Sequence, residues 1–157
     1  MIFNSLHPES KIWLYISSIN LGPYIKDKIF FLFKDFNDDW KSHGKKINGS
    51  LKFIEDNIVI IGANYPGGDM CGRSVDSQVR FISKIDQEFG LDLLNRNNLA
   101  FSISDSVSIF KFNEVEELIR KNKINRNTNF YNNLCTTNSD IIQLPFGDTP
   151  LGSRYFS

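Results

Sequence analysis

The sequence predicts an α+β fold in which helices cover one face of a mainly antiparallel sheet. Two observations predict this class. Short runs rich in β-branched and aromatic residues are typical of strands, and pairs of such runs are joined by only two polar residues, as in hairpins. Longer segments repeat apolar residues every three or four positions, as amphipathic helices do.

The chain of 157 residues has the length of one domain, so we expect a single domain over residues 1–157. Hydrophobic residues make up 41% of it and include 14 Phe, enough for a core without disulfides or metal. Eighteen basic residues balance eighteen acidic ones, so no net charge draws the protein to nucleic acid or to a membrane.

The first predicted elements are a strand and a helix. The segment KIWLYISSI, residues 11–19, is rich in β-branched and aromatic residues and predicts a strand. Pro23 suits the first turn of a helix. Apolar residues recur at helical spacing from Ile25 to Trp40, and we expect this helix to end at SHG, residues 42–44.

Two hairpins are predicted further along the chain. Asp56–Asn57 and Asp105–Ser106 are two-residue turn candidates between apolar runs. The runs are SLKFIE (50–55), NIVIIGAN (57–64), LAFSIS (99–104) and VSIFKF (107–112).

A second helix is predicted between these hairpins, with Ser74 as its N-cap. Its expected inner face consists of Val75, Val79, Ile82, Ile85 and Phe89. Asn113 and Glu116 have the spacing of an N-cap and its partner, which predicts a short third helix to about Lys121. The order β-α-β-β-α-β-β-α therefore begins in the ferredoxin-like way. From about residue 125 we expect an irregular tail, with an edge strand in 140–146.

Composition also excludes several classes of protein. No apolar run approaches the ~20 residues that span a bilayer, and the N-terminus lacks the pattern of a signal peptide. Cys71 and Cys135 form neither a disulfide framework nor a paired metal motif. We therefore expect a cytoplasmic protein with reduced thiols, no membrane contact, no metal and no cofactor.

The segment PGGDMCGRS, residues 66–74, has the spacing of a nucleotide-binding P-loop from Gly67 to Gly72. A P-loop requires lysine where Arg73 stands, and the rigid fork of arginine does not replace the point charge of lysine. A P-loop also follows a strand of a parallel sheet, whereas this loop follows half of a hairpin. The sequence therefore argues against a genuine ABC-type ATPase.

The same loop is a candidate anion site. Free N–H groups at a helix start attract anions, and Arg73 adds a bidentate donor. A turn followed by a helix cap explains the glycines equally well, and Asp76 in the first turn would compete for the same donors. The predicted ligand contacts in the loop are Gly67, Gly68, Gly72, Arg73 and Ser74.

Cys71 lies just before the predicted helix, where a thiol pKa is lowered. With His43 as base it would give a thiol enzyme, and Asp76 is a further weak catalytic candidate. Nothing in the sequence brings His43 to Cys71. A single cysteine near a loop is more often an inert small residue, so the sequence favours a binding protein over an enzyme.

The segment WKSHGKK, residues 40–46, has two interpretations. As the end of a helix it places His43 near the negative end of the helix dipole and Gly44 in the left-handed position that follows a helix. As a basic cluster it offers His43, Lys45 and Lys46 as contacts to phosphate.

Several segments together resemble one family. They are WLY (13–15), the Trp40, His43 and Gly44 pattern, RSVDSQVRFI (73–82), FGLDLLNRNNLAF (89–101), YNN (131–133) and the closing Arg154, Tyr155 and Phe156. The chain resembles a small uncharacterised family from Bacteroidota whose members are often labelled "ABC transporter ATPase". That family has no Walker loop, so the resemblance implies no ATPase. It has Cys where this chain has Arg73, and Cys71 is displaced by two positions, which weakens the thiol-enzyme hypothesis.

The sequence therefore predicts a binding module for a phosphate-bearing ligand, a nucleotide or an RNA, at residues 66–74. A thiol- or His-dependent hydrolase or transferase is one alternative. A protein-interaction subunit of a larger assembly is another, because Tyr155 and Phe156 beside Arg154 resemble an anchor for a protein partner. The same two rings would equally pack back onto the sheet.

Overall fold

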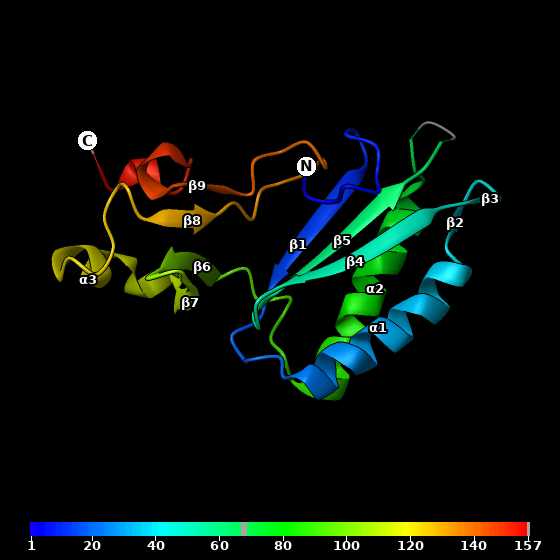
Figure 1. Cartoon of the computed structure of the whole chain (residues 1–157), viewed down its shortest axis with the longest axis horizontal. Coiled ribbons are helices and arrows are strands. Elements are labelled where there is room, and N and C mark those ends of the chain that lie inside the picture. The colour runs from blue at the N-terminus through cyan, green and yellow to red at the C-terminus, as the bar shows by residue number, and fades with distance from the viewer. Residues whose placement is uncertain (67–68, 157) are drawn as a thin grey trace.

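The computed structural model describes residues 1–66 and 69–156, and these contain two larger antiparallel sheets (Figure 1). The first sheet has the order β1-β5-β4, with strands Lys11–Ile16, Ile58–Asn64 and Asn48–Ile54. The second has the order β7-β6-β8-β9, with strands Ser106–Lys111, Asn98–Ile103, Asn129–Tyr131 and Gln143–Pro145. The predicted α+β class with mainly antiparallel sheets is confirmed.

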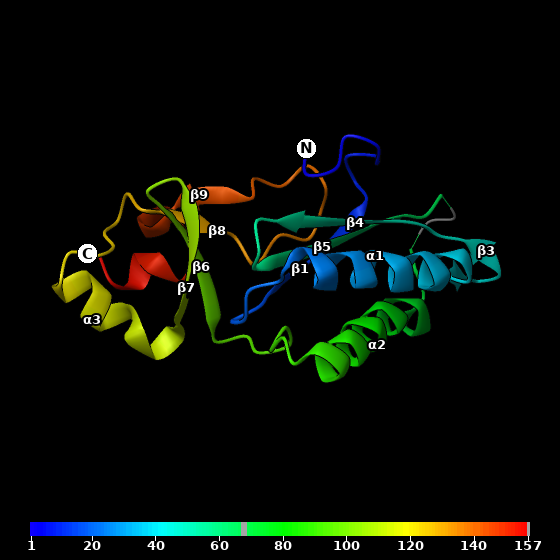
Figure 2. The ribbon, with the colours of Figure 1, turned by 60° about the horizontal axis from the view of Figure 1, so that its bottom comes forward.

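Helices α1 (Pro23–Asp38) and α2 (Gly72–Phe89) both cover one face of the first sheet, as predicted (Figure 2). Alternate side chains of the central strand β5 point to opposite faces. Val59 and Ile61 pack toward the helices, whereas Ile58 and Ile60 pack on the other face, and all four are fully buried. The central strand is therefore a continuous apolar run.

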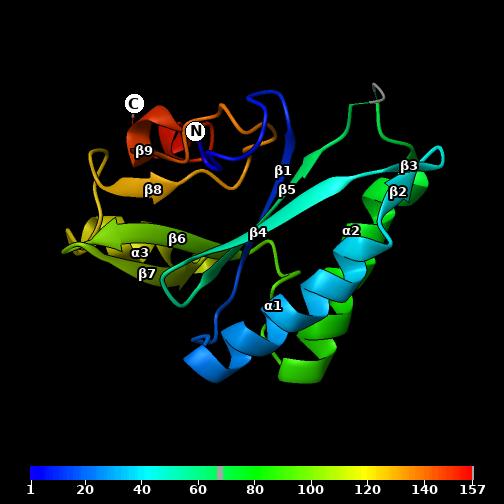
Figure 3. The same ribbon diagram turned by 45° about the vertical axis from the view of Figure 1, so that its right-hand side comes forward.

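The face away from the helices is covered by the N-terminal segment and by the second sheet (Figure 3). Asn138 holds the N-terminal segment in place, because its side-chain amide donates to the carbonyls of Phe3 at 2.8 Å and Leu6 at 3.0 Å. Ala100 and Tyr131 of the second sheet pack in the same cluster. The two sheets therefore share buried surface.

Strand β6 departs from the ferredoxin-like order. It pairs with β7 and β8 rather than extending the first sheet beside β1. Phe101 on β6 packs against Phe130 and Phe146, with ring centroids 5.1 and 5.0 Å away. These aromatic partners come from the tail, which is more regular than predicted: it supplies β8, β9 and two 3-10 turns, Phe146–Asp148 and Gly152–Arg154. The edge strand predicted in 140–146 is present as β9.

The first helix ends earlier than predicted. It stops at Asp38, and strands β2 (Lys41–Ser42) and β3 (Lys45–Lys46) form a hairpin in place of the expected helix end. His43 and Gly44 form its turn with φ of 53° and 77°, the positive values that a two-residue hairpin turn requires. The left-handed conformation expected at Gly44 is present, but it serves a hairpin and not a helix end.

The start of α2 also differs from prediction. Its N-cap is Cys71, not Ser74, and the helix begins at Gly72. Of the predicted inner face, Ile82 and Ile85 are fully buried and Phe89 packs on the core, whereas Val79 is 38% exposed. Gln78 and Phe81 are buried in addition.

Two hairpin turns and the third helix also differ from the predicted ones. The first hairpin has a three-residue loop, because Ile54 pairs with Ile58. The turn of the second hairpin is Ser104–Asp105, one residue earlier than predicted. The helix expected from Asn113 is a 3-10 turn, Phe112–Glu114, followed by α3 (Val115–Arg120).

Candidate functional site

A cavity of about 880 Å³ lies between the β2–β3 hairpin and the start of α2. We call it the hairpin cavity. Its lining includes Trp40, Lys41 and His43 from the hairpin side and Cys71, Arg73 and Ser74 from the helix side. The structure thus places His43 and Cys71 in one cavity, a relationship that the sequence left open.

Three hydrogen bonds dock the hairpin onto the helix start. The Trp40 indole N–H donates to the Ser74 carbonyl at 2.9 Å, and the Ser74 hydroxyl donates to the Lys41 carbonyl. The Ser42 hydroxyl accepts from the main-chain N–H of Cys71 at 2.8 Å. Trp40, Ser42 and Ser74 are each no more than 3% exposed, so the connection is buried.

Cys71 is the half-buried N-cap residue of α2. Its carbonyl accepts from the N–H groups of Ser74 and Val75, at 3.0 and 3.1 Å, and so closes the first turn. Hydrogen bonds from the Ser42 and Ser74 hydroxyls lower the pKa of the Cys71 thiol from 9.0 to about 6, against a smaller opposing effect of burial. Near neutral pH this cysteine is therefore mainly a thiolate.

The two hydroxyls have different roles, because each carries a single proton. Ser74 lies 3.1 Å from the Cys71 sulfur, but its proton is directed to the Lys41 carbonyl. Ser42 accepts from the Cys71 N–H and keeps its own proton for the sulfur. We therefore assign most of the thiolate stabilisation to Ser42, with smaller contributions from the side chain and the main chain of Ser74.

His43 is exposed at the hairpin turn. Its main-chain N–H contributes to lowering the pKa of Cys71. Its imidazole makes no hydrogen bond within residues 1–66 and 69–156, so it shares the cavity with Cys71 without being hydrogen-bonded to the thiol.

Of the other predicted site residues, some line the hairpin cavity and others do not. Arg73 lines the hairpin cavity from the exposed face of α2. Gly72 opens the helix with open space where a Cβ would lie. Asp76 and Lys45 are exposed and do not line the cavity. The Lys46 ammonium donates to the Asn37 and Ile47 carbonyls and so holds the end of α1. Gly67 and Gly68 lie outside the described residues.

The geometry gives no support to a P-loop. The hydroxyl of Ser74, which a P-loop would present to Mg²⁺, is buried and bonded to the Lys41 carbonyl. Strand β5, which leads into the loop, is antiparallel to both of its neighbours.

Ser42 is the functional residue that sequence reasoning missed. A His-Gly pair flanked by matching short segments is a hairpin signal, and it would have placed Ser42 on a strand facing the helix start. Interpreted as a helix end, residues 40–46 give Ser42 no such position.

Cys135 is buried, and the aromatic residues of the tail pack against a core cluster. Burial raises the pKa of the Cys135 thiol to about 11, with a further contribution from the charge of Asp140. Phe146 packs against Tyr155 and Phe156, at centroid distances of 6.2 and 6.1 Å. The two terminal rings therefore belong to a core cluster and are not a free anchor.

The described residues contain neither a candidate metal cluster nor a helix that could span a membrane. No group of three or more His, Cys, Asp or Glu side chains is arranged to hold a metal ion there. In the same part of the chain, every helix falls short of the length and apolar character that crossing a membrane requires.

Comparisons with protein-family models, with curated proteins and with solved structures gave no match. The resemblance to the Bacteroidota family therefore stays a prediction.

Proposed function

We propose that the protein catalyses a thiol-dependent hydrolysis or group transfer on an anionic substrate, with Cys71 as the nucleophile in the hairpin cavity. The observation that carries this proposal is the position of the Cys71 sulfur: it lies at the N-cap of α2, inside a cavity, next to two buried hydroxyls. Reactive cysteines occupy such partly exposed, electropositive positions at helix starts.

The charges of the cavity support an anionic substrate. Lys41, His43 and Arg73 line it together with a single carboxylate, Asp39, among its described residues. Arg73 can bind a carboxylate or phosphate group with two parallel hydrogen bonds. The N–H groups of the first helical turn add partial positive charge on the same side.

The proposed step begins with attack of the thiolate on an electrophilic carbonyl carbon, which forms a C–S bond. The leaving group departs with the electron pair of the broken bond and takes a proton from the His43 imidazolium. Water, or a second acceptor, then attacks the thioester and releases the thiolate, and His43 takes up the proton lost by that nucleophile.

A second candidate is a binding module for a phosphate-bearing nucleotide or RNA at the same helix start, which the cationic side chains of Lys41 and Arg73 also favour. The thiolate argues against it, because a negative sulfur already occupies the positive end of the helix. The two candidates differ in their response to Cys71→Ala: phosphate affinity would rise if binding were the function, whereas covalent chemistry would be abolished.

The test is the reaction of the full chain with p-nitrophenyl acetate near pH 7. We expect a burst of nitrophenolate equal to the protein concentration, with the acetyl group found on Cys71 by mass spectrometry. Cys71→Ser should lose the burst, and Cys135→Ser should keep it. The absence of acetyl-Cys71, together with tighter ATP or tRNA binding by Cys71→Ala, would favour the binding module.

We further propose a cytoplasmic setting. Both cysteines are free, and a thiolate nucleophile persists only where thiols stay reduced.

A further inference from the structure

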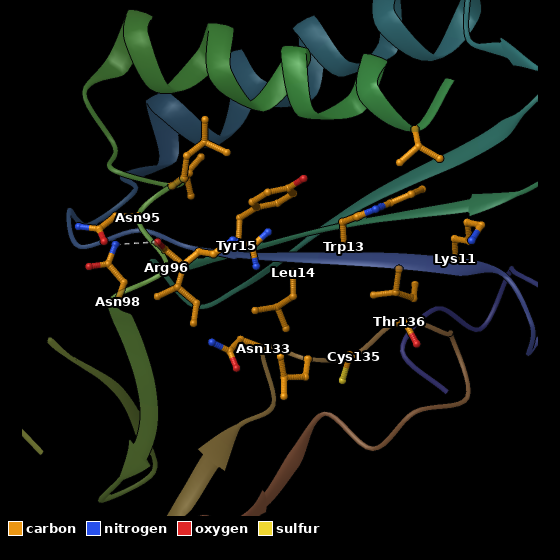
Figure 4. A pocket seen from close by; sticks show the side chains of 16 residues that line it. Lys11, Trp13, Leu14, Tyr15, Asn95, Arg96, Asn98, Asn133, Cys135 and Thr136 are labelled. Atoms are coloured by element: carbon orange, nitrogen blue, oxygen red, sulfur yellow. Dashed lines mark hydrogen bonds between the residues drawn. The ribbon is translucent and has the colours of Figure 1, made fainter. Parts of the chain in front are cut away.

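A second cavity, of about 350 Å³, follows the edge of β1 that faces away from β5 (Figure 4). We call it the β1-edge cavity. Beyond β1, its walls come mainly from residues 93–98, which lead into β6, and from residues 133–136, which follow β8. In the described part of the chain it shares no lining residue with the hairpin cavity.

The outer edge of β1 is paired only at its two ends. The Ile12 N–H donates to the Thr136 carbonyl at 3.0 Å, and the Ile16 carbonyl accepts from the Asn98 side chain at 3.1 Å. In an antiparallel strand both main-chain groups of a residue face one edge, and alternate residues face the same edge. Leu14 therefore presents its N–H and C=O to the cavity, and neither makes a hydrogen bond within the described residues.

The unpaired stretch of the β1 edge between Ile12 and Ile16, which we call the gap, has the length of a short strand. From Ile12 to Ile16 the chain rises about 13 Å at ~3.3 Å per residue. The Ile12 carbonyl and the Ile16 N–H flank the two free groups of Leu14, so an extended segment of about three to four residues has main-chain partners along the whole gap.

The charged side chains around the gap are cationic. Lys11 lies at one end and Arg96 at the other, and both are exposed (Figure 4). The described lining contains no Asp or Glu. Leu94 and Leu134 add exposed apolar surface, at 42% and 59% exposure. These features match a segment with apolar or β-branched residues between acidic ones.

We propose that the β1-edge cavity binds an extended acidic peptide segment of a partner protein, which adds to β1 as a strand at Leu14. Main-chain hydrogen bonds supply the affinity, and Lys11 and Arg96 select for acidic residues at the two ends of the segment. This binding does not depend on the proposed chemistry of Cys71.

The experiment uses the full chain labelled with ¹⁵N and the capped peptide Ac-Glu-Val-Thr-Val-Glu-NH₂. At saturating peptide, we expect hydrogen exchange at the Leu14 amide to slow by at least ~10-fold, because strand pairing removes that N–H from water. The amide of Trp13, which faces β5, serves as the internal control. A peptide of the same sequence with N-methylated amides should not bind, because it cannot pair as a strand.

Reversing the charge of Arg96 tests whether the β1-edge cavity selects acidic peptides. Arg96→Glu should weaken peptide binding by about tenfold, while Lys123→Glu, outside the cavity, should leave it unchanged. Absence of binding at millimolar peptide, or equal binding of the N-methylated peptide, would overturn the proposal. A dimer whose Leu14 amide is protected without peptide would also overturn it, in favour of a second copy of the chain.

Discussion

The Ser42 hydroxyl accepts a hydrogen bond from the main-chain N–H of Cys71 across 29 positions of sequence, at 2.8 Å. This bond fixes the hairpin against the helix start. It also leaves the proton of Ser42 free to donate to the Cys71 sulfur, and hydrogen bonding to Ser42 is the largest effect that lowers the pKa of this thiol.

Ser42→Ala should raise the pKa of Cys71 by about one to two units, toward the ordinary thiol value of 9.0. Alkylation of Cys71 by iodoacetamide at pH 6.5 should slow accordingly, by about 3- to 25-fold, because only the thiolate reacts. Ser77→Ala is the matched control, because Ser77 lines the cavity but bonds to Arg73 and Arg80 rather than to the sulfur. Equal rates in the two variants would remove Ser42 from the account.

The Cys71 thiolate should make stability depend on pH. The folded-state pKa lies at about 6, below the ordinary value of 9.0. The resulting stabilisation is fully present above the ordinary value and is lost as the pH falls through about 6. The Tm of the wild type minus that of Cys71→Ser should therefore increase from about pH 5.5 to about pH 9.

Cys135 has a raised pKa of about 11 and an effect of opposite sign at alkaline pH, but it is common to both proteins and cancels in the difference. A Tm difference that stays constant over this range would contradict a lowered pKa at Cys71.

Trp40→Phe should loosen the hairpin. It removes the hydrogen bond to the Ser74 carbonyl and part of a buried ring, and we expect a loss of about 1–3 kcal/mol in the free energy of unfolding. Trp13→Phe is the comparison, because Trp13 is only partly buried and its indole makes no hydrogen bond within the described residues. Urea unfolding of both variants measures the difference, and similar losses would argue against docking through Trp40.

The double variant Tyr155→Ala, Phe156→Ala should cost about 2–4 kcal/mol of stability, because both half-buried rings pack on Phe146. Thermal unfolding measures this loss. A variant that melts like the wild type would restore the hypothesis of a free aromatic anchor.

Local patterns predicted the fold class and most elements. Pro23 marked the first helix start, the runs around residues 50–64 predicted β4 and β5, and helical spacing predicted α2. Each of these depends on neighbouring residues in the chain, which is the information that periodicity contains.

Features set by long-range contacts were missed. Trp40 fitted the helical period, yet its indole bonds to Ser74 across the core and the chain turns into a hairpin there. Ser74 has the chemistry of an N-cap, but its hydroxyl is bonded to Lys41 and Cys71 takes that position. Strand β6 belongs to the second sheet and not to the first, because its Phe101 packs against aromatic residues of the tail. Tertiary contacts override local preference at each of these places.

The most direct test of the central claim is the pH profile of Cys71 alkylation by iodoacetamide in the wild-type chain, followed by mass spectrometry from about pH 5 to pH 9. Only the thiolate reacts, so the rate reports ionisation, and buried Cys135 serves as the slow internal reference. We expect a midpoint at about 6. A midpoint near the 9.0 of an ordinary cysteine, or a Cys71 that reacts as slowly as Cys135, would contradict a lowered pKa at Cys71.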